Sequence, residues 1–427
     1  MQPEADPSAS LRRTLGRSQA VTIGMGSMIG AGVFVVWSPA AELTGSPELL
    51  LLSLLLVSLV AACNAYSSAI LAVRYPSAGG TYVYGTQCLG PFPGYLAGWC
   101  FVVGKTASCA AMALTIGVYV VPGHERIAAV MAVLLFSAAN AFGATRSAKL
   151  SRVLVTVVLS VMAALALTAA WAWVSGDLDA PLASSGATAD PASAYSVLQA
   201  AGLLFFAFAG YARIATLAEE VRDPERTLTQ AIAITFVIVL GVYLVVALVV
   251  LGTLGSEGVA ASAAPVAASA EALWPGGFGW VIAVAALCAA AGALLNMLLG
   301  VSRVLLAMAR DAHLPRGLAV VGGPHHLPWA AEVAVTVTVL VIVVSVDVRG
   351  AIGFSSFGVL LYYAVTNASA WTVRGSAWWQ RALPVVGLIG CLVLAASLPL
   401  ASVIGGAIVV ALGIGWYLIN PLATMRE

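Results

Sequence analysis

Long apolar runs separated by short polar segments set the pattern of this chain. A membrane-spanning helix needs about 20 predominantly apolar residues. Uncharged runs of at least that length cover Leu49–Val73, Leu228–Ser256, Ala272–Ser302 and Ala382–Met425. The last run must hold two helices, with Ser397-Leu398-Pro399 as the turn between them. The pattern therefore predicts an all-α protein that crosses a membrane many times.

Twelve membrane-spanning segments are predicted from the whole pattern. They lie near residues 19–43, 48–73, 94–121, 127–143, 153–174, 196–217, 229–252, 278–309, 329–346, 351–372, 383–398 and 402–419. A polar tail, Met1 to Ser18, leads into the first segment without a cleavable signal sequence. The outer loops at 175–194 and 253–275 are rich in small residues, and we interpret them as flexible surface connections.

Basic residues test this topology because Lys and Arg favour cytoplasmic loops. With the N-terminus inside, 14 of the 19 basic residues fall in inner loops and tails. The outer loops hold two, Arg126 and Arg349, and the spans hold Lys105, Arg213 and Arg303. The asymmetry supports the helix count and places both termini in the cytoplasm. We expect a multi-pass protein of the plasma membrane.

The composition agrees with a membrane protein and limits the kinds of molecule that we expect the chain to bind. Only 9% of the residues are charged, against about 25% in an ordinary soluble domain. A net charge of +1 implies no nucleic-acid partner. The six cysteines lie singly in apolar segments, without the paired spacing of a metal site, so we expect neither a metal nor a cofactor. The sequence leaves the oligomeric state open.

Four glycines, Gly24, Gly26, Gly30 and Gly32, crowd the first predicted span. Glycine inside a helix costs roughly 1 kcal/mol against alanine, so this helix is either closely packed or broken. A dinucleotide fingerprint would need a strand–turn–helix context and a later acidic residue, and both are missing. A Gly26-x-x-x-Gly30 packing motif is the alternative. We favour an unwound segment, Gly26–Gly32, whose free amides face a carboxylate.

The sixth predicted span carries a second cluster, which reads Phe205-Phe-Ala-Phe-Ala-Gly-Tyr211. It lies five helices after the first cluster, as two inverted five-helix repeats would require. Free carbonyls around Phe206–Ala209 would suit an ammonium group, and the aromatic rings would cover an apolar side chain. The alternative is an ordinary aromatic packing stripe.

The loop after the sixth span contains Asp223-Pro224, the pattern of a helix N-cap followed by proline at the first helical position. We expect this pair to start the seventh span from the cytoplasmic face. Gating through Glu219, Glu220 and nearby arginines is the alternative role for this loop.

Four stretches of the chain carry a family resemblance. In chain order they read Gly26-Ser-Met-Ile-Gly-Ala-Gly-Val-Phe34, Arg74-Tyr-Pro-Ser-Ala-Gly-Gly-Thr-Tyr-Val-Tyr84 with Gly98-Trp99, Phe205–Thr227, and Gly300-Val-Ser-Arg-Val-Leu-Leu-Ala-Met-Ala-Arg-Asp311 with Leu314-Pro315. They resemble the first span, the loop between spans two and three, the sixth span with its following loop, and the eighth span of amino-acid permeases. These permeases belong to the amino acid–polyamine–organocation superfamily.

The resemblance implies a five-plus-five inverted repeat with discontinuous helices 1 and 6, plus two C-terminal helices. The expected regions are a cytoplasmic tail at 1–18, repeats at 19–174 and 196–372, two further spans at 383–419, and a C-terminal tail at 420–427. The implied function is secondary active transport of amino acids by alternating access.

The resemblance also implies a binding site. Backbone amides of the first span would bind the α-carboxylate of the substrate, at Ser27, Met28, Ile29, Gly30, Ala31 and Gly32. The sixth-span stretch would bind the α-amine, with Phe206 also as an aromatic gate, through Phe206, Ala207, Phe208, Ala209 and Gly210. Many members carry an acid two residues after the glycine of this span. This chain has Ala212 followed by Arg213, so the acid that would serve gating or proton coupling there is missing.

Lys105 lies about ten residues into the third predicted span, roughly 15 Å deep and near the middle of the hydrocarbon core. No carboxylate lies at similar depth in the predicted spans. An ionisable residue inside a membrane is a functional candidate because burying a charge is costly. Lys105 must lose its proton, find carbonyls at a broken helix, or meet the substrate carboxylate. A structural cation tied to exposed carbonyls is the alternative to a coupling role.

The eighth span bears on coupling. As the resemblance implies, a sodium site in this fold uses first-span carbonyls and paired hydroxyls of the eighth span, but the stretch Ala290–Met297 contains no Ser or Thr. We therefore expect proton coupling or exchange, with Lys105 as the coupling candidate. The lack of an anionic pocket lining favours neutral amino acids; a cationic amino-acid or polyamine antiporter is the alternative.

A membrane enzyme or a channel would be a different class of protein. An enzyme should show a cluster of His, Asp, Glu and Cys near a membrane face, and the sequence shows none, so we expect no enzyme. A channel should show a ring-forming polar filter and little sign of paired broken helices. The four histidines, His124, His313, His325 and His326, fall in predicted loops, and no role is assigned to them.

Overall fold

The computed structural model describes residues 16–76, 79–141, 148–177, 194–211, 221–274, 276–322, 328–373 and 378–420. In these ranges, nine helical segments are long and apolar enough to cross a membrane. Two shorter apolar helices accompany them, α9 (Ala194–Phe208) and α14 (Trp329–Ser345). The chain is an all-α membrane protein.

Each of the twelve segments predicted to span the membrane contains helix. In chain order these helices are α1 (Arg17–Met28) with α2 (Gly32–Val35) and α3 (Trp37–Thr44), α4 (Pro47–Arg74), α6 (Pro91–Val120), α7 (Glu125–Ala141), α8 (Ala148–Ser175), α9, α11 (Pro224–Ala261), α13 (Gly279–Arg310), α14, α15 (Val348–Thr372), α16 (Trp378–Ser397) and α17 (Leu400–Ile419). The turn predicted at 397–399 separates α16 from α17.

Local signals explain several helix starts. Proline occupies the first turn of α4, α6 and α11, where its missing N–H has no intrahelical partner to lose. Ser46 caps α4 by accepting from the Leu49 amide at 3.3 Å, and Asp347 caps α15 by accepting from the Gly350 amide at 2.8 Å. Asp223 does precede α11, but its φ is 47° and its side chain makes no capping hydrogen bond. The predicted start is confirmed and the predicted side-chain cap is wrong.

The prediction of a flexible connection at 253–275 is also wrong. α11 continues to Ala261 past a kink at Gly255, whose φ of 66° glycine adopts without strain. A further helix, α12 (Pro265–Leu273), then packs back on the molecule and buries Val266 and Ala270 completely. These residues are spaced i, i+4, so a short apolar stripe inside a small-residue loop was the overlooked signal. Most of the other predicted loop, 178–193, lies outside the described residues.

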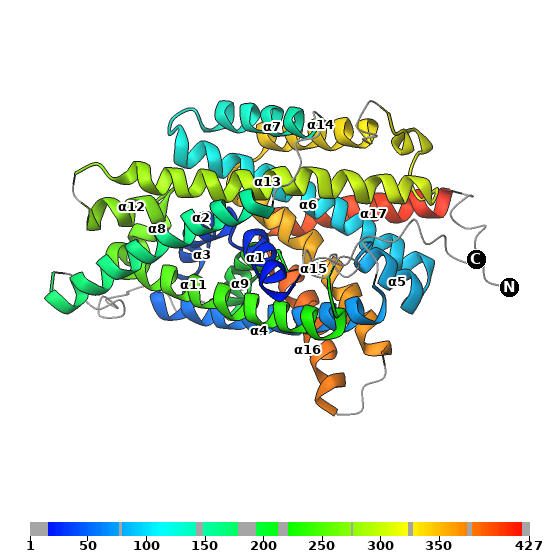
Figure 1. Ribbon diagram of the computed structural model, residues 1–427, viewed down its shortest axis with the longest axis horizontal. Coiled ribbons are helices and arrows are strands. Elements are labelled where there is room, and N and C mark those ends of the chain that lie inside the picture. Colours follow the sequence, from blue (N-terminus) through cyan, green and yellow to red (C-terminus); the bar gives the residue numbers. More distant parts are fainter. Residues whose placement is uncertain are drawn as a thin grey trace.

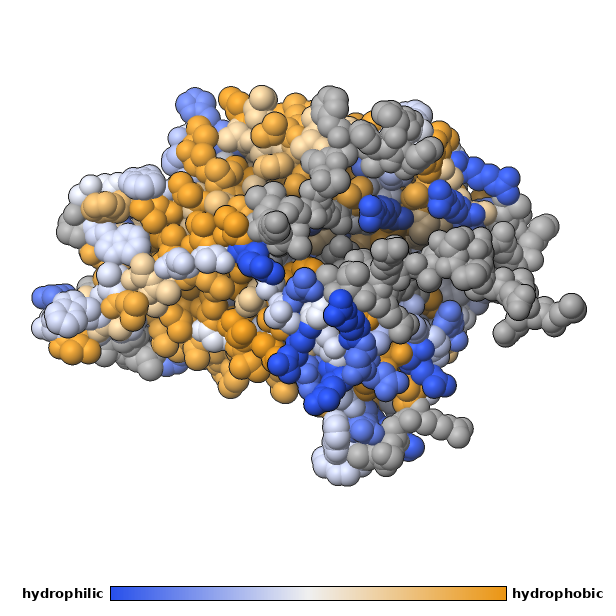
Figure 2. Space-filling model, viewed as in Figure 1, coloured by the Kyte–Doolittle hydropathy of each residue, from blue (hydrophilic) through white to orange (hydrophobic). Residues whose placement is uncertain are grey.

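The helices form layers around a central group (Figure 1). α1 and α9 lie near the middle, packed against α11 and α4, and α7 and α14 run together along one edge. α6 is the most enclosed long helix, with 83% of its apolar stretch buried, compared with 22% for α17. Apolar side chains cover the middle of the face seen in Figure 2, while hydrophilic ones gather toward its right-hand end. A charge on α6 therefore lies in the core, away from the membrane-facing surface.

Candidate functional site

The first spanning segment is broken between α1 and α2. Ile29 leaves the helical region, with φ −82° and ψ 69°, and the Gly30 amide donates to the Met28 carbonyl across a tight turn at 2.9 Å. α2 then runs into α3 through Val36, which keeps helical angles. The predicted unwinding is confirmed, but it is shorter than predicted because residues 26–28 stay helical. The amides of Ile29 and Gly30 donate to Met25 O and Met28 O, so they are not free as predicted. The break covers residues 29–31.

Glycines at this break allow close packing as well. A Cβ on Gly32 would lie 2.6 Å from the Cα of Ala207 in α9, a distance that real side chains do not adopt. A Cβ on Gly30 would lie 3.2 Å from the Cβ of Ala293 in α13. Close packing at Gly30 and Gly32 therefore accompanies the unwinding, while the Gly26-x-x-x-Gly30 packing motif stays a prediction.

The sixth spanning segment breaks where α9 ends, at Phe208. Residues 209–211 form a turn in which the Gly210 amide donates to the Phe208 carbonyl at 2.8 Å. A Cβ on Gly210 would overlap the carbonyl oxygen of Ser27 in α1, so the two broken segments touch at this point too. The sequence candidates Ala212, Arg213, Glu219 and Glu220 lie outside the described residues.

Tyr243 of α11 joins the two broken segments. Its hydroxyl lies 2.6 Å from the Met28 carbonyl oxygen and 2.7 Å from the Ala207 carbonyl oxygen. The side chain is fully buried, and its ring meets Phe208 edge-on at 4.9 Å between centroids. The sequence analysis missed Tyr243; a tyrosine inside an apolar run was the available signal, because buried tyrosines usually find a hydrogen-bond partner.

Lys105 lies at the middle of α6 and is 4% exposed. Its ammonium nitrogen, Nζ, donates to the carbonyl oxygen of Ala209 at 2.9 Å, and the Tyr363 hydroxyl on α15 lies 3.5 Å from the same oxygen. Of the three outcomes predicted for this lysine, the structure has the second, carbonyls at a broken helix. Among the buried residues that the structure describes, Lys105 has the only Lys, Arg, Asp or Glu side chain.

The carbonyls of the sixth segment each lie near a donor in this conformation. Phe206 O accepts from the Ala209 amide at 3.5 Å, Ala207 O lies beside Tyr243, and Ala209 O accepts from Lys105. The aromatic stripe partly serves packing, since the rings of Phe205 and Tyr363 meet edge-on at 5.8 Å. The alternative role of the cluster, aromatic packing, is therefore present. Its carbonyls are occupied here, and their binding of a substrate ammonium group stays a prediction.

Comparison with known proteins identifies the family. Residues 15–420 match the family model described as amino acid permease. The chain belongs to the amino acid permease family. A protein described as an uncharacterized transporter of Mycobacterium tuberculosis is 52% identical over 422 residues, which cover 97% of this chain and 93% of that protein. Cationic amino acid transporter 4 of Homo sapiens is 27% identical over 398 residues, covering 86% of this chain and 60% of that protein.

A plant relative is also named as an amino acid transporter. Cationic amino acid transporter 2, vacuolar, of Arabidopsis thaliana is 26% identical over 387 residues, covering 85% of this chain and 60% of that protein. The superfamily resemblance is thereby confirmed, and the permease is an amino acid transporter and not an enzyme.

The eighth spanning segment of the permease, α13, meets the first break through small side chains. Ala293 lies beside Gly30, and Ala289 and Ala290 are buried on the same helix. Asn296, the strongly polar residue of this stretch, donates to the Gly292 carbonyl of its own helix at 2.9 Å. The described part of α13 therefore brings alanine methyl groups, and not hydroxyls, to the break.

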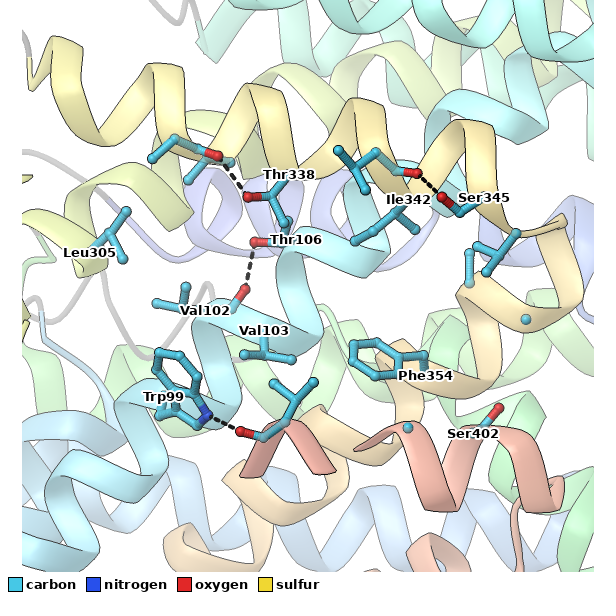
Figure 3. Close-up of a pocket in the computed structure, with 18 of the residues that line it drawn as sticks. Trp99, Val102, Val103, Thr106, Leu305, Thr338, Ile342, Ser345, Phe354 and Ser402 are labelled. Carbon is cyan, nitrogen blue, oxygen red and sulfur yellow. Dashed lines mark hydrogen bonds between the residues drawn. The ribbon is translucent and has the colours of Figure 1, made fainter. Parts of the chain in front are cut away.

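Figure 3 shows a separate apolar groove. Its volume is about 680 Å³, and α6, α14, α15 and α17 line it. The hydroxyls of Thr106 and Thr338, on its wall, are already bonded to the carbonyls of Val102 and Ala334 within their own helices. The predicted binding residues are not part of this lining, so the groove is distinct from the candidate site.

One histidine that the sequence analysis left without a role belongs to a hydrogen-bonded cluster. His313 follows α13 and is 9% exposed, and its Nδ1 lies 2.9 Å from the Tyr82 hydroxyl. That hydroxyl also donates to Asp311 at 2.5 Å. Tyr82 belongs to α5 (Thr81–Leu89), a short helix before α6 that the span prediction did not include. The cluster fixes the loop after α13 to α5.

Proposed function

We propose that the permease moves neutral amino acids across the plasma membrane by alternating access, coupled to protons or to exchange. In this proposal, backbone amides at Ser27–Gly32 bind the α-carboxylate, and backbone carbonyls at Phe206–Gly210 bind the α-ammonium group. Phe206 serves as the aromatic gate. Regions 19–174 and 196–372 act as the two repeats that move relative to each other.

The observation that carries this proposal is the contact between Lys105 and Ala209. An alkylammonium group already rests on a backbone carbonyl at the sixth break, 2.9 Å away and out of contact with bulk water. A carbonyl that accepts this ammonium has the chemistry to accept the ammonium group of an amino acid. The first break lies directly against the sixth, so backbone polar groups of both segments lie close enough together to serve the two ends of a zwitterion.

The charge of Lys105 supports a neutral side chain on the substrate. Like charges in an apolar interior repel strongly, and buried charges need a partner. A lysine or arginine substrate would bring a further cation next to Lys105. The human and plant relatives named cationic amino acid transporters support the alternative, a cationic substrate.

Uptake into proteoliposomes tests the proposal. Radiolabelled amino acids are offered singly at several pH values, with and without sodium, and empty liposomes serve as the control. We expect uptake of neutral amino acids that depends on pH or on a trapped amino acid and does not depend on sodium. Uptake of arginine or lysine with exclusion of neutral amino acids would establish the alternative, and background flux for all twenty would contradict amino-acid transport in this system.

The proposed orientation has both termini in the cytoplasm, supported by the distribution of basic residues. Fusions at residue 427 distinguish the two orientations. A fluorescent protein should mature and alkaline phosphatase should stay inactive, since phosphatase folds only outside the cytoplasm. Active phosphatase at this terminus would place it outside the cytoplasm and contradict the proposed orientation.

A further inference from the structure

The Ala209 carbonyl is the acceptor that a substrate ammonium group would compete for. α9 ends one residue earlier, so this oxygen lies beyond the helix that would otherwise supply its donor. The neighbouring Phe206 and Ala207 oxygens have an amide and the Tyr243 hydroxyl beside them. Ala209 O holds the ammonium of Lys105, so an incoming ammonium group meets another cation there.

The described surroundings of Lys105 provide little to balance a second positive charge. Among the residues that the structure describes, the titratable groups facing it are the Cys109 thiol on α6 and the Tyr363 hydroxyl on α15, with Tyr211 stacked on Tyr363. The described charged side chains on helices packed against α6 lie nearer the helix ends. They are Glu125 and Arg126 on α7, Arg303 and Arg310 on α13, Glu332 on α14, and Arg349 on α15. Two ammonium groups at one buried carbonyl therefore repel without a carboxylate from these helices to offset them.

We propose that the substrate ammonium group displaces Lys105 from the Ala209 carbonyl, and that Lys105 releases one proton in the process. This rests on the proposed function, because it assumes an amino acid at the sixth break. One N–H bond of the lysine ammonium breaks, the electron pair stays on Nζ, and the proton passes to water on the open side. When the substrate leaves, Nζ takes a proton from water on the opposite side. Amino acid and proton then move in opposite directions, one for one.

Calorimetry of the full-length permease in lipid nanodiscs tests this inference. L-leucine, L-alanine and L-phenylalanine are titrated at pH 6 in phosphate and in bis-Tris, whose different heats of protonation reveal proton release. We expect about one proton released per amino acid bound. Affinity should rise about tenfold per pH unit while the lysine of the empty carrier is charged, because the complex then holds one proton fewer.

Three variants make the test specific. Lys105→Met should bind the amino acid without releasing a proton and without a pH-dependent affinity. Lys105→Arg should bind none of the three, because a guanidinium group does not give up its proton. Thr106→Ala is the matched control on the same helix, since the Thr106 hydroxyl bonds only the Val102 carbonyl at 2.7 Å among the partners the structure describes. It should keep the proton release of the natural protein.

The outcomes separate this inference from the proposed function. Binding without proton release in the natural protein would mean that Lys105 stays charged and pairs with the substrate carboxylate, which overturns the inference and leaves transport intact. Proton release that persists in Lys105→Met, or that 4-methylpentanoate causes without an ammonium group, would overturn it too. No binding of any of the three amino acids would contradict the neutral substrate class, and the inference would fall with it.

Discussion

The two helix breaks are stabilised in different ways. At residues 29–31 the chain is shaped by steric fit, with Gly30 and Gly32 admitting Ala293 and Ala207 at distances that larger residues exclude. At residues 209–211 the chain depends on donors from other helices, Lys105 on α6 and Tyr363 on α15, with Tyr243 on α11 beside Ala207. Both breaks depend on close packing against other helices, but the second also needs hydrogen-bond donors from distant side chains.

The difference matters because the surroundings are apolar. A buried carbonyl left without a donor costs about 1–3 kcal/mol, so the second break is stable only while its donors stay in place. A steric fit does not depend on the protonation state of its partner. The sixth segment should therefore respond more strongly than the first to the loss of a donor side chain. The following substitutions test that contrast.

The largest effect is expected for Gly210→Ala, which disrupts the contact between the two breaks. Its Cβ would overlap the Ser27 carbonyl, and backbone atoms cannot rotate away. We expect destabilisation of at least about 3 kcal/mol, the upper part of the usual range for overpacking, and loss of transport. Thermal unfolding followed by size-exclusion chromatography, together with uptake, measures both.

Gly241→Ala is the matched control for that variant. Gly241 lies on α11, and a Cβ there would meet open space. Because alanine favours a helix over glycine by about 1 kcal/mol, this variant should be as stable as the natural protein or slightly more so. Equal behaviour of the two variants would show that the contact at Gly210 is not restrictive.

Lys105→Ala should have the next largest effect, on coupling. It removes the ammonium donor from the Ala209 carbonyl and the proton that the lysine exchanges. We expect loss of accumulation driven by an inside-acid pH gradient, while exchange across the membrane stays measurable. Radiolabelled leucine uptake into proteoliposomes with imposed gradients checks this. Accumulation equal to that of the natural protein would assign Lys105 a structural role.

Tyr243→Phe removes the hydroxyl shared by the two broken segments. Ala207 O then loses the phenol donor, while Met28 O keeps the Gly30 amide at 2.9 Å, so we expect a loss of stability of about 1–3 kcal/mol. Tyr119→Phe is a suitable comparison, because that hydroxyl donates to a single carbonyl, Phe34 O, at 2.7 Å. Denaturation midpoints of the two variants should differ, with the Tyr243 variant less stable; the reverse order would contradict the bridging role.

Tyr363→Phe should give the smallest effect of the series. Its hydroxyl is 3.5 Å from Ala209 O, at the limit of a hydrogen bond, and Lys105 already donates to that oxygen. We expect a change in unfolding free energy below about 1 kcal/mol. A loss as large as that of Tyr243→Phe would make Tyr363 a principal donor of the second break.

The contrast between the breaks also explains what the sequence predicted. Apolar run length predicted the spans, and glycine density predicted the break at Gly30, because both signals are local. The donors of the second break were harder to predict, since Lys105 and Tyr363 lie 104 and 154 positions from Ala209. Lys105 stood out by its charge, whereas a tyrosine in an apolar run, such as Tyr243 or Tyr363, signals a buried hydrogen bond without indicating its partner. The α12 helix was missed because alanine-rich loops and helices look alike.

The position of the Tyr243 hydroxyl between two carbonyl oxygens has a further consequence. A phenol carries one hydrogen, yet carbonyl oxygens of two different spanning segments lie within its reach. Met28 O also accepts from the Gly30 amide at 2.9 Å, so it keeps a donor whichever way the hydroxyl points. Rotation about a single C–O bond therefore decides whether Ala207 O holds the phenol hydrogen, and that carbonyl can be released without any movement of the ring.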